Sequence, residues 1–244
     1  GVANDTLFTL GLMTESPTDR LGLTALGLQT QQWLALARKH GYEEVYVYGI
    51  DEAVGEQLKA QQAAWKAVQD AGAGTFVAGF KGIFEDMGGL LDIAVLYGQP
   101  DPEEAKKFHS VGSRVFTYAF PQGGPEEPET FRRNYGLVLW QAGFDGAMTY
   151  AYQHGLEHIW NDFDHATYRD LNFAYPTMDG VVSTVQFAGY REARDDVRYM
   201  ATLVAAIDTC GDPQVRATAQ QFVDTLDPQG DLYEVRAQMV QHIL

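Results

Sequence analysis

The sequence is short of three things: cysteine, positive charge and long apolar runs. Its single cysteine, Cys210, excludes an intrachain disulfide and a thiolate metal cluster. Lysine and arginine number 17 against 33 acidic residues, so the net charge of −16 repels nucleic acid and anionic lipid. No apolar run approaches the roughly 20 residues that a membrane span requires. We therefore expect neither nucleic acid nor a membrane as a partner, and a neutral ligand instead.

The sequence also lacks the glycine motifs of nucleotide-binding sheets. Neither GxGxxG nor GxxxxGK(S/T) follows a candidate strand, which removes the usual support for a nucleotide site. The first residues, "GVANDT", have neither the charged nor the apolar region of a secretory signal, and there is no initiator methionine. We expect a processed product or a piece of a longer chain. Its 244 residues, 45% of them apolar, suffice for a sizeable globular core.

Short β-rich runs alternate with helical segments through the first part of the chain. The six strand candidates are residues 7–13, 43–50, 75–80, 90–98, 114–120 and 145–152. The longer helical segments between them are residues 22–40, 53–71 and 128–142. Alternation of this kind predicts βαβ units and a parallel sheet. The strands are runs of Val, Phe, Tyr and Ile, as expected when both faces of a sheet are covered.

Two architectures fit this alternation, an open doubly wound sheet or part of a (β/α)8 barrel. The missing nucleotide motifs favour the barrel, which typically takes about 250 residues and eight strands. Because only six strands are recognisable, the fold we predict is a (β/α)8 TIM-barrel type that lacks its first two βα units and has extra C-terminal helices. A missing N-terminal segment or a second copy of the chain would then complete the barrel.

The pattern breaks after residue 152. A long aromatic and acidic loop covers residues 153–180, and an extended stretch follows at 181–187. Long loops in compact domains are usually functional or disordered, and this aromatic content argues against disorder. Helices are expected near 188–207, 213–225 and 231–243. We predict a barrel domain over 1–210 and a helical extension of the same domain over 211–244.

Two adjacent acids, Asp51 and Glu52, end the second strand in "EEVYVYGIDEA". In parallel α/β sheets and barrels, functional groups lie at the carboxyl ends of the strands. Paired carboxylates suit acid/base chemistry because their proximity separates their pKa values. The alternative is a helix start, with Asp51 as N-cap and Glu52 in the first turn. The sequence leaves both interpretations open.

Aromatic residues gather at the same strand ends and in the loops that follow. They are Tyr48, Phe80, Tyr97, Tyr118, Phe120, Tyr150, Tyr152 and Trp160. Aromatic faces with a few directional polar groups suit a neutral glycan, although Tyr and Phe also pack well in strands. The candidate substrate-binding residues are Tyr48, Lys81, Tyr97, Tyr118, Tyr150, Tyr152, Trp160 and Asp162.

Two charged stretches have simpler explanations than a catalytic site. "HGLEH" (154–158) resembles a metal-ligand spacing, but it is not HExxH and has no helical period. We expect solvated loop residues there, and neither a metal nor another cofactor. In "YREARDDVRYM" (190–200), Arg191 and Asp195 are four apart, and Asp195 and Arg198 are three apart. Such spacings usually give structural ion pairs on a helix.

Three stretches together resemble glycoside hydrolase family 123 and its uncharacterised relatives. They are "YVYGIDEA" (46–53), "FRRNYGLVLWQAGFDGAMTYAY" (131–152) and "YPTMDGVVSTVQFAGYREARDDVRYMATL" (175–203). The resemblance covers roughly residues 40–210, and the last stretch is its most specific part. It implies a (β/α)8 barrel preceded by a β-sandwich, an extracellular or periplasmic location, and activity on β-linked N-acetylgalactosamine. The implied mechanism is substrate-assisted retention, an exception to the two-carboxylate scheme.

The resemblance also implies a role for each acid. Asp51 would accept a hydrogen bond from the acetamido N–H and hold that group beneath the anomeric carbon. Glu52 would protonate the leaving oxygen and then deprotonate the incoming water. Two other functions stay open: a catalytically silent carbohydrate-binding barrel, and a glycosidase for another sugar without acetamido participation.

Overall fold

The computed structural model describes residues 5–243, which form two compact units. The first unit is the chain up to Tyr118 together with Phe144–Met148. The second is Ala119–Gly143 and the chain from Thr149 onward, so the boundary expected at 210/211 falls inside it. No helix in the described part of the chain is both long and apolar enough to span a membrane.

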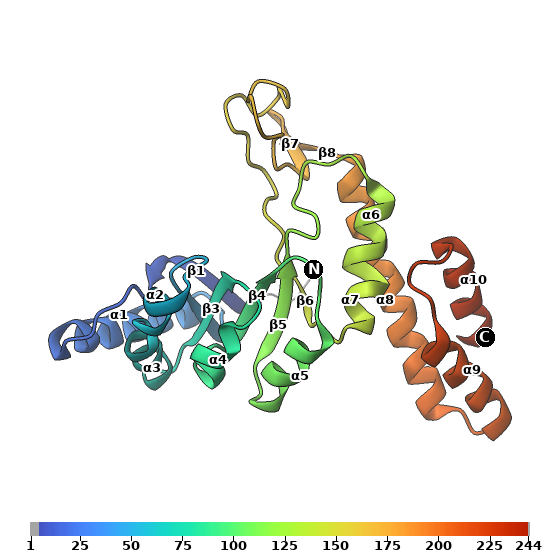
Figure 1. Cartoon of the computed structure of the whole chain (residues 1–244), viewed down its shortest axis with the longest axis horizontal. Helices are drawn as coiled ribbons and strands as arrows, with labels where there is room; N and C mark the ends of the chain where they lie inside the picture. The colour runs from blue at the N-terminus through green and yellow to red at the C-terminus, as the bar shows by residue number, and fades with distance from the viewer. Residues whose placement is uncertain (1–4, 244) are drawn as a thin grey trace. The chain divides into compact units, whose positions relative to one another are not determined.

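The first unit contains a curled parallel sheet of six strands in sequential order (Figure 1). The strands are β1 (Thr6–Met13), β2 (Glu44–Tyr48), β3 (Gly74–Gly79), β4 (Ile93–Tyr97), β5 (Arg114–Tyr118) and β6 (Gly146–Ala147). This arrangement confirms the predicted parallel α/β class. Within residues 5–243 the sheet is a half-barrel and does not close, so the fold is compatible with a partial TIM-like barrel.

Helices follow the strands of this unit as the sequence pattern predicts. They are α1 (Arg20–Lys39), α2 (Gly55–Lys59), α3 (Gln62–Asp70), α4 (Ile83–Met87) and α5 (Pro102–Ser110), with a 3₁₀ turn at Gly88–Leu90. The single helix expected over 53–71 is wrong, because the chain forms α2 and α3 separately. Leu58 of α2 and Trp65 of α3 are buried, whereas Val54 is 59% exposed.

The side chains of the strands alternate between a helix-covered face and an opposite face. Val45 and Val47 of β2 are buried on the helix side. Tyr46, with Phe8 of β1 in register, lies on the other face, which we call the inner face. The rings of Phe8 and Tyr46 stack there with centroids 5.3 Å apart. Gly74 makes room, since a Cβ at its position would lie 2.5 Å from the Tyr46 ring.

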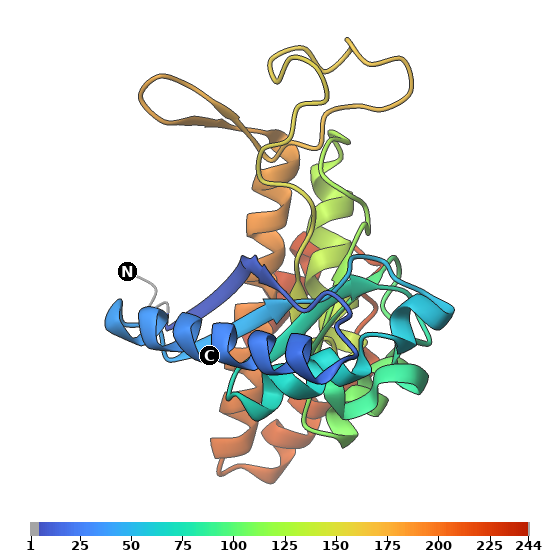
Figure 2. The same cartoon turned by 90° about the vertical axis from the view of Figure 1, so that its left-hand side faces the viewer.

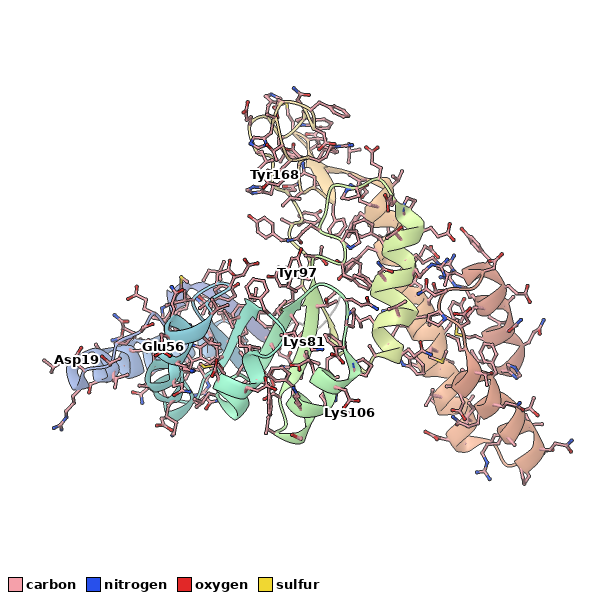
Figure 3. All side chains as sticks on the ribbon, viewed as in Figure 1. Asp19, Glu56, Lys81, Tyr97, Lys106 and Tyr168 are labelled. Carbon is pink, nitrogen blue, oxygen red and sulfur yellow. The ribbon has the colours of Figure 1, made fainter. Side chains whose placement is uncertain are left out.

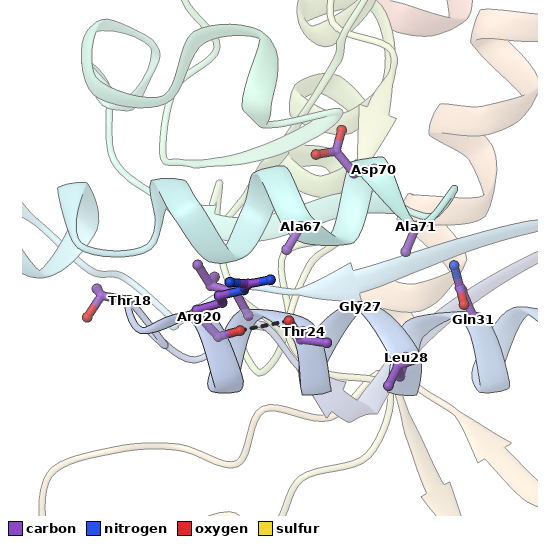
Figure 4. A pocket seen from close by; sticks show the side chains of 10 residues that line it. Thr18, Arg20, Thr24, Gly27, Leu28, Gln31, Ala67, Asp70 and Ala71 are labelled. Atoms are coloured by element: carbon purple, nitrogen blue, oxygen red, sulfur yellow. Dashed lines mark hydrogen bonds between the residues drawn. The ribbon is translucent and has the colours of Figure 1, made fainter.

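A groove of about 590 Å³ separates α1 from α3 on the helical layer (Figure 4). Its lining is Thr18, Arg20, Leu23, Thr24, Gly27, Leu28, Gln31, Ala67, Asp70 and Ala71. Asp70 forms an ion pair with Lys66, and Thr24 donates a hydrogen bond to the carbonyl of Arg20. Because these side chains stand on the outer helices, the groove has no part in the strand-end site described below.

The second unit is mostly helical. It contains α6 (Pro128–Arg133), a π-helical turn (Asn134–Val138), α7 (Leu139–Gln141), α8 (Val185–Thr209), α9 (Pro213–Thr225) and α10 (Leu232–Ile243). A short antiparallel hairpin, β7 (Ala174–Pro176) and β8 (Val181–Ser183), precedes α8 and extends beyond its beginning (Figure 2). The helix expected over 128–142 is interrupted at Gly136, where the backbone (φ −104°, ψ −111°) is not helical.

Apolar and ionic contacts hold this unit together. Its core joins Met200 and Leu203 of α8 to Leu232 and Met239 of α10. Beside that core, the buried Asp196 carboxylate accepts from Arg132 Nε at 2.7 Å and from Arg236 Nε at 2.6 Å. The charged stretch of α8 thus acts structurally, through Asp196 rather than through the predicted Arg191–Asp195 pair. The predicted Asp195–Arg198 pair is present at 3.5 Å and exposed.

Candidate functional site

The two acids lie in a turn between β2 and α2, at the carboxyl edge of the parallel sheet. Helix α2 begins at Gly55, and its N-cap is Val54, which makes no side-chain capping bond. The interpretation of Asp51 as an N-cap is therefore wrong. Both Asp51 and Glu52 are exposed. With no capping role, the pair needs another explanation.

Glu52 has an unusual backbone conformation, with φ at 50°. This left-handed region is uncommon for residues other than glycine, asparagine and aspartate. The turn is held by a hydrogen bond from Glu52 N to Ala78 O at 3.0 Å, which ties it to the end of β3. Helix α2 begins beyond this turn, at Gly55. Such local strain concentrates at functional sites, where the surrounding structure enforces it.

Asp51 is oriented by Tyr48, the last residue of β2. The Tyr48 hydroxyl donates to Asp51 Oδ1 at 2.6 Å and accepts from Ala78 N at 3.3 Å. A phenol fixed by a backbone donor therefore holds one carboxylate oxygen. No hydrogen bond to Oδ2 is found within the described residues, so this oxygen is available to a ligand donor.

Glu52 is oriented by Tyr118, the last residue of β5. The Tyr118 hydroxyl donates a short hydrogen bond to Glu52 Oε1. Tyr118 is only 5% exposed, so its ring is fixed by packing while the carboxylate it holds stays accessible. The two acids thus have separate phenol partners from separate strands. Each carboxylate is held in one orientation, as preorganised chemistry requires.

The environment keeps both phenols protonated. Burial, followed by the hydrogen bond to Asp51, raises the pKa of Tyr48 above its ordinary value. Burial, followed by the hydrogen bond to Glu52, raises the pKa of Tyr118 in the same way. Both hydroxyls therefore remain hydrogen-bond donors to the acids at neutral pH and well above it.

Residues that the sequence did not single out shape the turn. Gln61 Oε1 accepts from Ile50 N at 2.7 Å and from Trp65 Nε1 at 3.2 Å. Gly49 fits closely, since a Cβ there would lie 2.6 Å from the Trp65 ring. Gln61 is fully buried, but a glutamine in a helical pattern carries no signal of this role. The one signal at Gly49 is its residue type, because a glycine at a strand end often marks a place where another group approaches the backbone closely.

A row of aromatic rings continues from Tyr118 along the strand ends. Tyr97 stands at the end of β4 (Figure 3). Its ring centroid lies 5.5 Å from that of Tyr118 and 5.9 Å from that of Phe80. Tyr97 is 56% exposed and Phe80 is 37% exposed, so both offer surface to a ligand. Lys81, directly after Phe80, forms an ion pair with Asp101. Of the predicted set, Tyr48 and Tyr118 contact the acids, and Tyr97 packs against Tyr118. No contact of Lys81 with either acid is found within residues 5–243.

Two predicted aromatic residues of the second unit lie just before its long loop. Tyr150 is half-exposed, and its hydroxyl is 3.1 Å from His154 Nδ1. The ring of Tyr152, also half-exposed, lies 6.0 Å from that of Phe187. Both rings keep accessible surface, so both remain candidate ligand contacts of this unit.

The long loop itself is organised by side-chain contacts. Trp160, 52% exposed, stacks on Tyr175 of β7 with centroids 5.1 Å apart. Asp162 accepts from Asp170 N at 2.6 Å and forms an ion pair with Arg169. Its carboxylate is thereby committed to the loop, which makes Asp162 a structural residue in this conformation.

Metal binding has no support in the part of the chain that the structure describes. No group of three or more His, Cys, Asp or Glu side chains there can hold a metal ion. In the "HGLEH" stretch, His154 contacts Tyr150, and His158 Nδ1 accepts from Trp160 N at 3.3 Å. These contacts are those of a folded loop.

Neither a protein-family model nor a curated protein sequence matches the chain. Its chemistry must therefore be judged from the site itself. The site offers two exposed carboxylates on adjacent residues, a phenol donor on each, and exposed aromatic rings beside them. Such a site can accept a hydrogen bond from a ligand, exchange a proton with it, and stack against an apolar face of it.

Proposed function

We propose that the chain carries the acid pair of a retaining glycoside hydrolase that cleaves a terminal β-linked 2-acetamido sugar, such as N-acetylgalactosamine, with substrate assistance. The observation that carries the proposal is the arrangement of Asp51 and Glu52. They are adjacent and exposed, they have no capping role, and each is held by a tyrosine hydroxyl. An orienting acid beside a proton donor, without a separate nucleophile, is what substrate assistance needs.

In this mechanism the free oxygen of Asp51, Oδ2, accepts a hydrogen bond from the acetamido N–H. The acetamido oxygen then attacks the anomeric carbon, and the bond to the leaving oxygen breaks as Glu52 gives that oxygen its proton. The product is an oxazolinium-like intermediate. Water next attacks the anomeric carbon, Glu52 takes its proton, and the acetamido group is restored. Two inversions at one carbon give overall retention.

The two tyrosines support these separate roles of Asp51 and Glu52. Tyr48 and Tyr118 each occupy one oxygen of an acid and leave the other oxygen for substrate. In a substrate-assisted reaction, the position of the acetamido group decides whether its oxygen reaches the anomeric carbon. An acid fixed by a phenol sets that position more strictly than a freely rotating one. Tyr97 and Phe80 supply apolar faces for sugar rings.

We extend the proposal to the architecture. The six strands are the last six of a (β/α)8 barrel of the glycoside hydrolase family 123 type, and two βα units beside β1 complete it. Within residues 5–243, β1 is an edge strand with no neighbour on its outer side, and its Leu10 is 66% exposed. This edge supports the extension, because parallel sheets are normally covered and edge strands protected. A preceding segment or a second copy of the chain would supply those units.

Hydrolysis of an aryl β-N-acetylhexosaminide by Glu52→Gln and a matched control tests the function. Glutamine cannot donate the proton, so kcat/KM should fall by roughly 10²- to 10⁴-fold. The control is Glu56→Gln, an exposed acid on α2 whose contact with Lys59 is 3.7 Å long. It should keep the wild-type rate. Full activity in Glu52→Gln would show that Glu52 is not the acid.

A thiazoline analogue of the oxazolinium separates the alternatives. Substrate assistance predicts inhibition at least roughly 10²-fold tighter than substrate binding, because the analogue resembles the intermediate. A glycosidase without acetamido participation would hydrolyse its sugar and resist the thiazoline. A silent carbohydrate-binding protein would bind glycans with no turnover, and Glu52→Gln would then change nothing in a hydrolysis assay.

A further inference from the structure

Helix α1 has apolar side chains on two opposite faces. The face that packs into the first unit is formed by the buried residues Leu26, Thr30, Leu34 and Ala37. On the opposite face, at 3.6 residues per turn, lies a set of exposed apolar residues. This set, which we call the outer stripe, is Leu21, Ala25, Leu28, Ala35 and Leu36. Its three leucines are 83%, 56% and 50% exposed in chain order.

The barrel architecture proposed above does not account for the outer stripe. In a (β/α)8 barrel the helices form an outer ring, so each helix packs on the sheet and beside its two neighbours. Further βα units beside β1 would therefore leave the outer stripe in water. A helix with apolar residues on opposite faces is typical of a helix packed between two partners. The first unit supplies one partner of α1, and the second is still to be found.

The leucines of the outer stripe are spaced almost symmetrically. Leu28 lies seven residues after Leu21 and eight residues before Leu36. The stripe is roughly 22 Å long, at 1.5 Å per residue. If α1 of a second copy lies antiparallel on the first, Leu21 of each copy comes near Leu36 of the other, and the two Leu28 side chains meet near the axis. A two-fold dimer uses one patch on both subunits, and this stripe fits that requirement.

The charges at the two ends of α1 fit the same arrangement. Glu15 and the N-cap Asp19 are exposed at one end, and Arg38 and Lys39 are exposed in the last turn at the other. Neither Arg38 nor Lys39 has an ion pair within residues 5–243. Arg20 lines the groove on the α3 side of the helix. An antiparallel second copy brings the acidic end of each helix beside the basic end of the other and opposes the two helix dipoles.

The charge of the whole chain also favours contact through α1. With a net charge of −16, two copies repel each other over most of their surface. Helix α1 is the exception among the long helices, because its 20 residues include no Asp or Glu. Two copies that meet through α1 therefore bring no helix carboxylates face to face.

We propose that the outer stripe of α1 is a homodimer interface, in which the α1 helices of two copies of the chain pack antiparallel about a two-fold axis at Leu28. The proposal is independent of the proposed function. One pair of helices makes a small interface, so the dimer is reversible.

Sedimentation equilibrium of the whole chain tests the interface with a matched pair of variants. Leu28→Lys places two like charges at the axis and should raise the dimer Kd at least roughly 30-fold. Lysine is a good helix former, so α1 itself should be preserved. The control is Val215→Lys, which adds the same charge at a 53% exposed position of α9. This variant should dimerise as the wild type does.

A second pair of variants tests the charges. Arg38→Glu places an acid opposite the acidic end of the second copy and should raise the Kd by roughly 3- to 10-fold. Arg216→Glu makes the same change in net charge at an exposed position of α9, where the arginine has no ion pair within residues 5–243. Its Kd should stay within about twofold of the wild type.

Two results would overturn the proposal. One is a wild-type chain that stays monomeric at about 100 μM, in which case another segment or another protein covers the outer stripe. The other is a dimer with equal Kd in Leu28→Lys and Val215→Lys, because the contact would then lie elsewhere. Circular dichroism checks that Leu28→Lys keeps the helix content of the wild type. If it does not, Leu36→Lys at the end of the stripe replaces it and should also raise the Kd.

Discussion

The left-handed backbone of Glu52 can be tested by comparing two substitutions at the same position. Glu52→Ala and Glu52→Gly both remove the carboxylate and its hydrogen bond from Tyr118. They differ in backbone freedom, because a residue with a Cβ loses roughly 1–2 kcal/mol at φ 50° and glycine does not. The difference in unfolding free energy between the two variants therefore isolates the backbone term.

The magnitude follows from two opposed contributions. Glycine removes roughly 1–2 kcal/mol of left-handed strain from the folded state. It also gives the unfolded chain more conformational freedom, which lowers stability by about 0.4–1 kcal/mol. Glu52→Gly should thus be more stable than Glu52→Ala by about 1 kcal/mol. Gln32, exposed in the middle of α1, provides the matched pair in ordinary helix. There Gln32→Gly should be less stable than Gln32→Ala, also by about 1 kcal/mol.

Urea denaturation of the four variants at one pH measures both differences. We expect the glycine variant to be the more stable of the two at position 52 and the less stable of the two at position 32. If glycine is the less stable substitution at both positions by the same margin, Glu52 does not have a left-handed backbone. The turn would then not be strained to position an acid. Both variants at position 52 should also lack hydrolytic activity, since neither has a proton to give.

Two further predictions concern pH and the second unit. The raised pKa values of Tyr48 and Tyr118 mean that the folded protein keeps protons that the unfolded chain releases above about pH 10. The free energy of unfolding should therefore stay constant up to about pH 10 and decrease as pH rises further. In Tyr118→Phe, this decrease with pH should be smaller when it is measured by urea denaturation. An equal decrease in the variant and the wild type would contradict the prediction. Asp196→Asn should lower stability by about 3–5 kcal/mol, because it leaves the buried Arg132 guanidinium without its counter-charge. The neighbouring Asp195→Asn, at a 40% exposed side chain, should change stability by less than about 0.5 kcal/mol, and equal losses at both positions would refute the assignment.

The periodicity of the sequence predicted most of the secondary structure of this protein. Alternating β-rich and helical segments gave the parallel class, and strands such as β2 and β5 lie within two residues of the predicted bounds. Helix α5 begins at Pro102, because proline suits the first turn and Asp101 caps it. These features depend on neighbours in sequence, which is why sequence patterns report them.

The candidate site could be predicted only in part. The sequence placed Asp51 and Glu52 at a strand end, but it left a helix cap as an open alternative, which the start of α2 at Gly55 overturns. It also predicted one helix over 53–71, where α2 and α3 form separately. A left-handed residue other than glycine carries no local signature, so no pattern in the sequence announced the conformation of Glu52.

The sequence by itself thus determined where the strands lie along the chain and which residue types stand at their ends. Only the tertiary structure decided which phenol holds which acid. Glu52 and its partner Tyr118 are 66 residues apart, and they meet because β2 to β5 pair in one fixed register. Register is set by the packing of whole strands against one another, and local sequence does not specify it.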